Sequence, residues 1–469
     1  MSAVAGPLWT IAEIVAATNG YADGVTAQAV TAVSIDSRDI QPGALFVAIK
    51  GDAHDGHDFV GAALDAGAAA ALVSADRAPG LGRKGVIGVR DTLKALEDLA
   101  RAARERSSGQ IVAITGSVGK TSTKEAVRSV LAASGRVHAS IKSYNNHWGV
   151  PLMLANLPRD VPFGVFEIGM NHAGEIAHLV QLVRPHIAVV TAVAPAHLEF
   201  FPSVTAIAEA KAEILLGLEA GGTAVLNADH DYLHVLMGAA RRLGIDKIVT
   251  YGFDESSDWH IGTPRVADGM SHATITHEGR VQRLALRVPG RHMLANATAA
   301  IAVNALVGGG AMAAIDALGQ FAAPEGRGET LRLGNPKKPL LLVDESYNAN
   351  TASMRAAMDV YAGITPPSGR KVLVLGDMLE LGRESQNLHR SLADAVRATG
   401  ATDIYLVGKD MAALRDSLGD GQVTAHAESV EQLAETILSG LAPGDSVMIK
   451  GSKGVRLAGL VRRIRETFA

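Results

Sequence analysis

The chain has 469 residues, too many for one ordinary hydrophobic core, so two or three domains are expected. Its formal net charge of −4 offers no basic face to nucleic acid or to an anionic membrane surface, and we expect neither as a partner. It has no cysteine, which excludes disulfides and thiolate metal sites and favours a reducing, cytoplasmic compartment. Met1–Thr10 lacks the charged and apolar regions of a signal peptide, and no apolar run reaches the ~18 residues needed to span a bilayer.

Residues 1–90 predict a small mixed α/β domain. A helix is expected over Trp9–Asn19, followed by a short strand and turn in Val33–Gly43. Apolar strands are expected over Ala44–Ile49 and Ala70–Val73, with an Ala-rich helix between them.

Residues 91–327 and 328–469 each alternate short apolar strands with helices, which predicts two mostly parallel sheets. The strands expected in the first of these blocks are Ile111–Thr115, Phe163–Ile168, Ile187–Val193 and Thr223–Leu226. Those expected in the second are Leu340–Val343, Val372–Leu375, Ile404–Val407 and Ser446–Ile449. Between Trp259 and Val288 the pattern changes to period two around a His277–Arg280 turn, which predicts an antiparallel flap.

A glycine-rich loop follows the first strand of the second block and leads straight into a helix. In Gly116-Ser-Val-Gly-Lys-Thr121 the backbone N–H groups and the helix N-terminus would face phosphate oxygens. Lys120 would bridge the β- and γ-phosphates, and the Thr121 hydroxyl would hold Mg²⁺. Ile114 stands where the usual eight-residue pattern has its first glycine, so an ordinary strand–helix turn is the alternative. Because strand and helix flank the loop as nucleotide binding requires, we predict a nucleoside triphosphate site.

Polar residues also follow other predicted strands, where ligands of open α/β sheets bind. Glu167 could be an oxygen ligand for Mg²⁺ opposite Thr121, although a solvated charge is an equal alternative. His197 could bind a second metal ion, although a lone histidine is more often structural. Asp344–Asn350 forms a polar run after a buried strand; caps and turns explain such residues too, but we favour function for the whole run.

Several of these stretches together resemble the motifs of the Mur ligase family. The central-block motifs are Thr115–Thr121, Glu167–Asn171 with Gly174–Ile176, His197–Glu199 and Ala210–Ile214. The motifs similar to the D-alanyl-D-alanine-adding branch of the family are Tyr144–Pro151, Asp344–Asn350 and Gly376–Gly382. Those that fit its UDP-substrate domain are Asp36–Arg38, Pro42–Gly43, Leu45–Val47 and Asp55–His57. The likeness covers nearly the whole chain in the right order.

The resemblance implies an α/β protein of three domains. Residues 1–90 would bind the UDP substrate, and residues 91–327 would form a P-loop ATPase-like domain. Residues 328–469 would form a Rossmann-like domain that binds the incoming dipeptide and helps to close over ATP.

The implied reaction is ATP-dependent ligation of D-Ala-D-Ala to UDP-MurNAc-tripeptide. ATP phosphorylates the terminal carboxylate, the dipeptide amine attacks the acyl phosphate, and ADP and phosphate leave. A carboxylate needs such a leaving group, and cations must neutralise both anionic partners. Another amide ligase of this architecture, such as the third-residue Mur ligase or a folylpolyglutamate synthase, is the nearest alternative. A P-loop ATPase switch is the alternative of a different class. We expect a monomer.

The resemblance also implies roles for individual residues. Lys120, His197 and Lys211 would be catalytic, and two Mg²⁺ ions would be held by Thr121, Glu167, His197 and Lys211, the lysine as its carbamate. From sequence alone, however, Lys211 is interpreted as a surface lysine. Nucleotide contacts are implied for Thr115, Gly116, Ser117, Gly119, Lys120, Thr121, Asn296, Arg327 and Asp344. Substrate contacts are implied for Ser37, Arg38, Asn145, Asn146, Tyr347 and Asn348.

Two positions depart from the family pattern. Glu345 stands where relatives commonly have aspartate, which keeps the charge on a longer side chain. Lys453 stands where relatives commonly have arginine, so a carboxylate contact there loses the bidentate guanidinium geometry.

Overall fold

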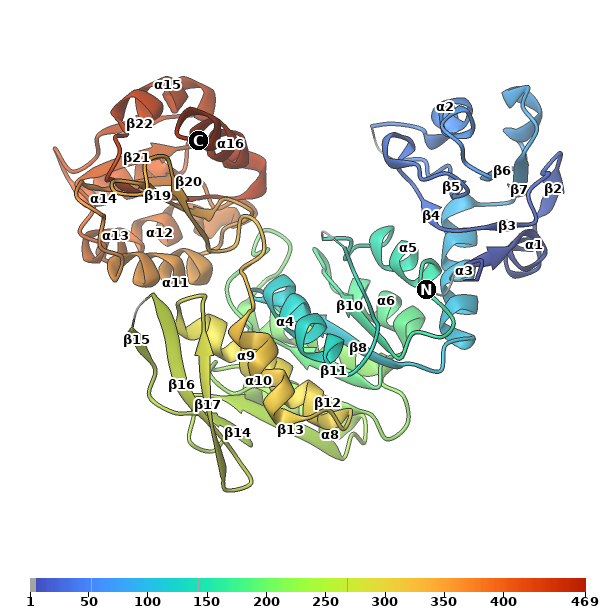
Figure 1. Cartoon of the computed structure of the whole chain (residues 1–469), viewed down its shortest axis with the longest axis horizontal. Coiled ribbons are helices and arrows are strands. Elements are labelled where there is room, and N and C mark those ends of the chain that lie inside the picture. The colour runs from blue at the N-terminus through green and yellow to red at the C-terminus, as the bar shows by residue number, and fades with distance from the viewer. Residues whose placement is uncertain (1–5, 52, 142, 268) are drawn as a thin grey trace.

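The protein folds into three α/β bodies that follow one another along the chain. The computed structural model describes residues 6–51, 53–141, 143–267 and 269–469. Two of the expectations above touch positions outside these ranges, namely residues 1–5 of the signal-peptide segment and Asp268 of the flap. Figure 1 shows the N-terminal and C-terminal bodies at opposite ends of the central body, both rising from the same side of it.

The N-terminal body is built on a five-stranded sheet in which only β2 runs antiparallel to its neighbour. The strands in spatial order are β2 (Tyr21–Asp23), β7 (Val86–Val89), β6 (Ala70–Ser74), β5 (Leu45–Val47) and β4 (Val33–Ser34). The strands expected around residues 44–49 and 70–73 are thereby confirmed as β5 and β6, and the Ala-rich helix between them is α2 (Val60–Asp65).

The first helix is shorter than expected. Helix α1 spans Ile11–Thr18, because the Thr10 hydroxyl accepts a hydrogen bond from the Glu13 amide and caps the helix at that point. The two residues before it, Trp9 and Thr10, form β1, which pairs with β3 (Ala29–Val30).

The central body contains a ten-stranded sheet. Its spatial order is β15 (Arg265–Ala267), β16 (Met270–His277), β14 (Trp259–Ile261), β13 (Lys247–Gly252), β12 (Thr223–Asn227), β11 (Ile187–Val190), β8 (Gln110–Thr115), β10 (Phe163–Glu167) and β9 (Val137–Ala139), with β17 (Arg280–Leu286) paired to β16. The four predicted strands are confirmed as β8, β10, β11 and β12, which lie parallel to their neighbours. The flap is confirmed as antiparallel, since β14, β15 and β17 all pair with β16 in that sense.

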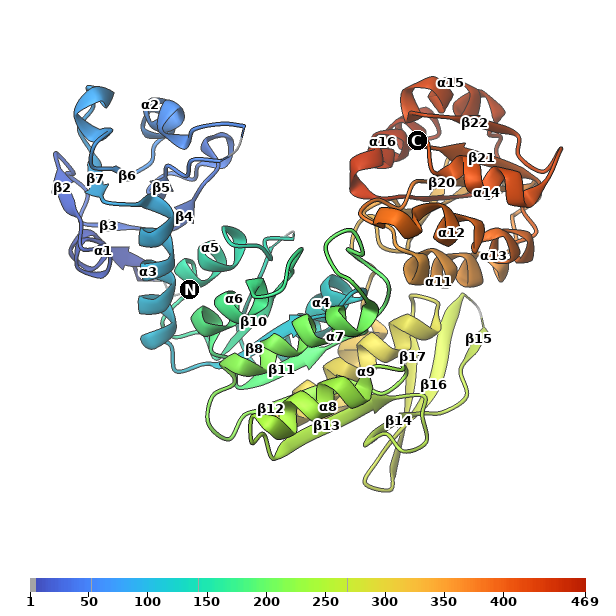
Figure 2. The same cartoon turned by 180° about the vertical axis from the view of Figure 1, so that it is seen from behind.

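Helices cover both faces of this sheet, as alternating buried side chains of the strands require. On the face seen in Figure 1 lie α4 (Lys120–Ala132), α9 (Arg291–Leu306) and α10 (Ala311–Gly319). On the face seen in Figure 2 lie α5 (Gly149–Ala155), α6 (Glu175–Val183), α7 (Val204–Ala212) and α8 (Leu233–Arg242). Along β8, for example, the Val112 side chain packs on the face covered by α4, α9 and α10. The next side chain, Ala113, packs on the face covered by α5, α6, α7 and α8.

The C-terminal body is a doubly wound sheet in which only the edge strand β18 is antiparallel. The spatial order is β18 (Glu329–Leu333), β19 (Leu340–Glu345), β23 (Ser446–Lys450), β20 (Lys371–Gly376), β21 (Asp403–Val407) and β22 (Ala425–Ala427). The helices are α11 (Thr351–Ala362), α12 (Ser385–Arg390), α13 (Ala393–Ala398) and α14 (Met411–Leu418) on one face, and α15 (Val430–Gly440) and α16 (Leu457–Thr467) on the other. All four predicted strands are confirmed, and with them the α/β fold class.

The N-terminal and central bodies share one hydrophobic core. Helix α3 (Thr92–Glu105) connects them and packs against both α1 and α5. The Asn156 amide pairs with both backbone groups of Val33, accepting from its N–H and donating to its carbonyl oxygen, each at 2.9 Å. The Trp9 indole donates to the Ala155 carbonyl oxygen at 2.8 Å. By contrast, both cores of the C-terminal body contain only side chains from residue 331 onward.

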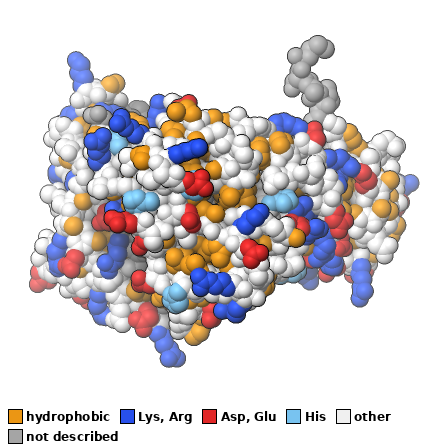
Figure 3. All heavy atoms as spheres, turned by 90° about the horizontal axis from the view of Figure 1, so that it is seen from below, with side chains coloured by type: hydrophobic (Ala, Val, Ile, Leu, Met, Phe, Trp, Pro, Cys, Tyr) orange, Lys and Arg blue, Asp and Glu red, His pale blue; other side chains and the backbone are white. Residues whose placement is uncertain are grey.

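Charges of both signs are interspersed on the face shown in Figure 3, as the small net charge leads one to expect. Within the described ranges, no helix has the length and apolar character needed to cross a membrane.

Candidate active site

The glycine-rich loop joins β8 to α4 at the carboxyl end of the central strands. Helix α4 begins at Lys120, directly after Gly119. Gly116 and Gly119 have φ angles of +150° and +84°, a region that side chains rarely adopt. A Cβ on Gly116 would lie 2.0 Å from the Thr191 hydroxyl oxygen, and one on Gly119 would lie 2.8 Å from the Asn296 amide oxygen. Backbone conformation and close approach therefore both require glycine here.

The segment after β11 holds this loop in shape. The Thr191 hydroxyl lies 2.5 Å from the Val118 carbonyl oxygen and 3.2 Å from the Thr115 carbonyl oxygen. The Ser117 N–H donates to the Ala192 carbonyl oxygen at 2.7 Å, and its hydroxyl donates to that of Ala194 at 3.0 Å. Ser117, predicted to contact the nucleotide, thus has structural partners for both of its donors. Thr191 was not found from the sequence, where a lone threonine after a strand gives no signal.

Lys120 is the cation of the loop. Its half-buried ammonium donates to the Gly116 carbonyl oxygen at 2.7 Å. Burial lowers the pKa of Lys120, and the nearby Arg327 lowers it further, while Glu167 opposes this by raising it. These three charged groups therefore interact around one end of the loop.

Glu167 is no solvated charge, since its side chain is only 1% exposed. It ends β10, the strand beside β8, and its carboxylate accepts two hydrogen bonds. The Thr121 hydroxyl donates to Oε2 at 2.7 Å, and the Asn145 amide donates to Oε1 at 2.7 Å. A buried carboxylate and a hydroxyl side by side are oxygen donors of the kind that Mg²⁺ prefers, so this pair fits that ion. Asn145, predicted to contact substrate, here orients Glu167.

Lys211 lies on α7 and is buried, with 1% of its surface exposed. The interpretation as a surface lysine is therefore wrong: α7 turns this side chain inward. Among the described residues its ammonium makes no hydrogen bond. Burial holds the pKa of Lys211 well below its ordinary value, and the charge of Lys120 lowers it further. Lys211 is thus a buried amine close enough to the phosphate loop to interact with its cation.

His197 turns toward the C-terminal body. Its Nδ1 lies 2.6 Å from Oε2 of Glu380, a residue that the sequence analysis did not single out although it stands in the Gly376–Gly382 motif. In the part of the chain that the structure describes, no three His, Cys, Asp or Glu side chains converge as a metal site. Of the predicted metal ligands, the structure brings Thr121 into contact with Glu167 and pairs His197 with Glu380.

The remaining predicted nucleotide residues lie on α9, the interdomain link and β19. Asn296 is buried on α9 beside Gly119, as the close approach above shows. The Arg327 guanidinium stacks over the Tyr347 ring, 4.0 Å from its centroid. Asp344 is buried at the end of β19, where its carboxylate accepts a hydrogen bond from the Ser346 amide at 3.0 Å.

Glu345 and Lys453, the two departures from the family pattern, each contact a residue of the segment 345–450. Glu345 pairs with Lys450, its register partner on the adjacent strand β23, at 3.1 Å. The same ammonium donates to the Asn348 carbonyl oxygen at 3.2 Å, so Glu345 stabilises the turn after β19. The Lys453 ammonium lies 5.9 Å from the Tyr347 ring centroid, on the same aromatic side chain that Arg327 contacts.

The predicted substrate residues of the N-terminal side lie on loops. Ser37 and Arg38 form a 3₁₀ turn that Asp36 caps, and Asp36 also binds the Arg38 guanidinium through two hydrogen bonds of 2.8 and 2.7 Å. The Arg38 side chain is 88% exposed. Asn146 accepts a hydrogen bond from the amide of Gly149, the first residue of α5, at 2.9 Å.

Comparison with known proteins agrees with this organisation. Residues 29–104 match the Mur ligase family catalytic domain, residues 114–304 the Mur ligase middle domain, and residues 326–453 the Mur ligase glutamate ligase domain. The UDP-N-acetylmuramoyl-tripeptide–D-alanyl-D-alanine ligase of Escherichia coli (strain K12) is 35% identical over 460 residues, which are 97% of this chain and 98% of that protein. The chain belongs to the Mur ligase family.

Solved structures support the same assignment. This Mur ligase superimposes on MurF from Acinetobacter baumannii with a TM-score of 0.85 and 28% identity, covering 98% of this chain and 99% of that one. It superimposes on MurF ligase from Thermotoga maritima in complex with ADP with a TM-score of 0.77 and 25% identity, covering 93% and 97% of the two chains. The three-domain architecture expected from the sequence is therefore confirmed.

Proposed function

We propose that this Mur ligase uses ATP to join D-alanyl-D-alanine to UDP-N-acetylmuramoyl-tripeptide, giving the UDP-MurNAc-pentapeptide needed for peptidoglycan synthesis. The observation that carries the proposal is the Thr121–Glu167 contact beside Lys120 of the glycine-rich loop. It occurs in a chain that matches the UDP-N-acetylmuramoyl-tripeptide–D-alanyl-D-alanine ligase of Escherichia coli over 97% of its length. An enzyme that uses ATP and a UDP-linked substrate belongs in the cytoplasm, and we expect it to act as a monomer.

The phosphate loop prepares the tripeptide carboxylate for attack. The loop N–H groups and Lys120 would bind the triphosphate and hold its γ-phosphate, and the Thr121 and Glu167 oxygens would hold Mg²⁺. When bound, the metal ion neutralises phosphate charge that would otherwise repel the carboxylate. Asn145 keeps the Glu167 carboxylate in place through its hydrogen bond to Oε1. Asn296 and Arg327 would contact the nucleotide from α9 and the interdomain link.

Lys211 would act as its carbamate. Because burial and Lys120 lower its pKa, Lys211 carries a larger neutral fraction than an exposed lysine does, and a neutral amine adds to CO₂ with loss of one proton. The product is an oxygen donor of negative charge. Its attraction to Lys120 replaces the repulsion that a Lys211 ammonium would meet from Lys120. With His197, the carbamate would hold the second Mg²⁺ ion.

The C-terminal and N-terminal bodies would supply the other two binding sites. Tyr347 and Asn348 follow β19 and would meet the incoming dipeptide, together with the Lys453 cation in place of the family's arginine. Ser37 and Arg38 would meet the UDP group; since Asp36 already binds the Arg38 guanidinium, this arginine is oriented in advance.

The test is a coupled assay on the purified chain with UDP-MurNAc-tripeptide as acyl donor. We expect phosphate release only when D-Ala-D-Ala is also present, and a product whose mass is that of the pentapeptide. Use of a single amino acid or of glutamate would identify the alternative amide ligases instead. Phosphate release without any acceptor would identify an ATPase switch and refute the proposal.

A further inference from the structure

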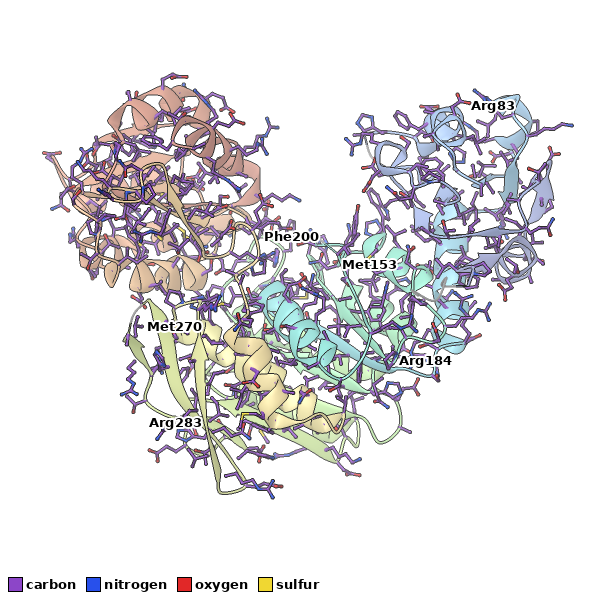
Figure 4. All side chains as sticks on the ribbon, in the orientation of Figure 1. Arg83, Met153, Arg184, Phe200, Met270 and Arg283 are labelled. Atoms are coloured by element: carbon purple, nitrogen blue, oxygen red, sulfur yellow. The ribbon has the colours of Figure 1, made fainter. Side chains whose placement is uncertain are left out.

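The central and C-terminal bodies are joined by hydrogen bonds between two short loops. Besides the His197–Glu380 contact at 2.6 Å, the Glu199 N–H donates to the Glu380 carbonyl oxygen at 3.1 Å. In Figure 4 the labelled Phe200 marks this junction, and its N–H donates to the His197 carbonyl oxygen at 2.9 Å. The carboxylate and the backbone carbonyl oxygen of Glu380 therefore both contact the loop that carries His197.

Each loop has a left-handed residue at the point where the two loops meet. His197 and Glu380 have φ angles of +59° and +63°, although neither is glycine. Left-handed backbone is uncommon for residues other than glycine; histidine adopts it more often than most residues do, whereas for glutamate it is unusual. Gly382 has a φ of +55°, and a Cβ there would lie 3.1 Å from the Glu199 Cα. The close approach and the positive φ together favour glycine at position 382.

The Glu380 loop is fixed within its own body. The Leu379 N–H donates to the Ser452 hydroxyl at 2.9 Å, and the Met378 N–H donates to His389 Nε2 at 3.0 Å. The loop of His197 is fixed in the same way, because Ala194, three residues before it, is hydrogen bonded to Ser117 of the phosphate loop. A carboxylate whose neighbouring backbone is hydrogen bonded within the C-terminal body therefore meets a histidine three residues from a contact with the phosphate loop.

A carboxylate in this position decides which ring nitrogen of the histidine carries hydrogen. Ionised Glu380 can only accept, so the hydrogen of the short contact lies on Nδ1, and the lone pair of the neutral ring lies on Nε2. Histidines that bind metal ions through one nitrogen commonly donate the other N–H to a carboxylate, which fixes both tautomer and orientation.

We propose that Glu380 is a positioning residue that orients His197 across the domain boundary, so that His197 is ready to bind Mg²⁺ only when the C-terminal body is docked. The inference rests on the proposed role of His197 in the second metal site. It adds a consequence for the reaction: the metal site is completed by docking of the body that brings the dipeptide.

The first test measures metal binding rather than turnover. Mn²⁺ is titrated, with electron paramagnetic resonance detection, into the full chain saturated with a non-hydrolysable ATP analogue. Two Mn²⁺ ions should bind with different affinities. We expect Glu380→Ala to reduce the affinity of the more weakly bound ion about tenfold or more, the usual effect of removing a carboxylate that is hydrogen bonded to a metal-binding histidine. Glu380→Gln keeps an acceptor oxygen and should recover most of that loss. Glu384→Ala removes an exposed carboxylate of the same loop and should leave Mn²⁺ binding unchanged.

A double-mutant cycle separates positioning from simple docking. In a His197→Ala background, Glu380→Ala should weaken Mn²⁺ binding no further, because the two residues act as a unit. Since the chain has no cysteine, labels at Met312→Cys and Asp394→Cys can report the distance between the two bodies by energy transfer. A changed distance with unchanged Mn²⁺ affinity in Glu380→Ala would show a docking contact only and overturn the inference.

Failure of the inference is distinguishable from failure of the proposed function. If the wild-type chain ligates D-Ala-D-Ala but Glu380→Ala binds Mn²⁺ as the wild type does, the positioning role is wrong and the ligase assignment stands. If the wild-type chain shows no ligation, the proposed function fails at once. Should Glu380→Ala not fold, as judged by circular dichroism, a tenfold loss in Glu380→Gln would likewise count against the inference, because that variant retains the acceptor.

Discussion

Replacing Thr191 by valine tests whether the phosphate loop is shaped before the nucleotide arrives. Valine has the same branching but lacks the hydroxyl that meets the Val118 and Thr115 carbonyl oxygens at 2.5 and 3.2 Å. Losing a buried hydrogen bond of this kind costs about 1–2 kcal/mol. If that energy holds the loop in its binding shape, ATP affinity should fall about 5–30-fold, since ~1.4 kcal/mol corresponds to a factor of ten.

The assay is calorimetric titration of an ATP analogue, with two matched variants. Thr191→Ser keeps the hydroxyl and should bind almost as the wild type does. Thr123→Val is the second control, because the Thr123 hydroxyl is buried and has no hydrogen-bond partner among the described residues. Removing it should leave ATP affinity unchanged and raise the free energy of unfolding by about 1 kcal/mol. Wild-type affinity in Thr191→Val, or an equal loss in Thr123→Val, would refute the reasoning.

Further predictions concern the charged groups. Lys120→Ala should abolish ligation yet leave the circular dichroism spectrum unchanged; a wild-type rate would disprove its phosphate role. Lys211→Ala should be inactive and partly rescued by added short-chain carboxylates, whereas full activity without them would exclude the carbamate. Glu345→Gln leaves Lys450 buried without its counter-charge, so urea unfolding should show a loss of about 3 kcal/mol; a loss near zero would contradict this. Burial lowers the pKa of His230 to about 4. Below about pH 6.5 the unfolded chain therefore binds a proton that the folded chain does not, and stability should fall between pH 6.5 and 4. That loss should be smaller in His230→Asn.

The sequence was sufficient for features that depend on neighbours along the chain. The strand, glycine loop and helix around Gly116–Thr121 could be predicted because each has a local signature: an apolar run, residues that tolerate positive φ, and helical periodicity. The four strands expected in each of the two large sheets were predictable for the same reason.

Features that depend on sheet register or on docking could not be predicted. Glu345 and Lys450 are 105 residues apart in sequence and meet only because β19 and β23 are neighbours in register. His197 and Glu380 are 183 residues apart and lie in different bodies. The burial of Lys211 depends on which side of α7 faces the sheet, and with small apolar residues on several sides of that helix the pattern does not fix the orientation.

The shared core of the first two bodies has a consequence for how the chain can be divided. A protease cut or gene truncation near residue 90 would separate α3 from α1 and expose apolar side chains on both fragments, which would then tend to aggregate. A cut at the link near residue 327 passes between separate cores, so residues 328–469 should survive as a folded fragment and could be expressed, crystallised and titrated with dipeptide independently of the rest.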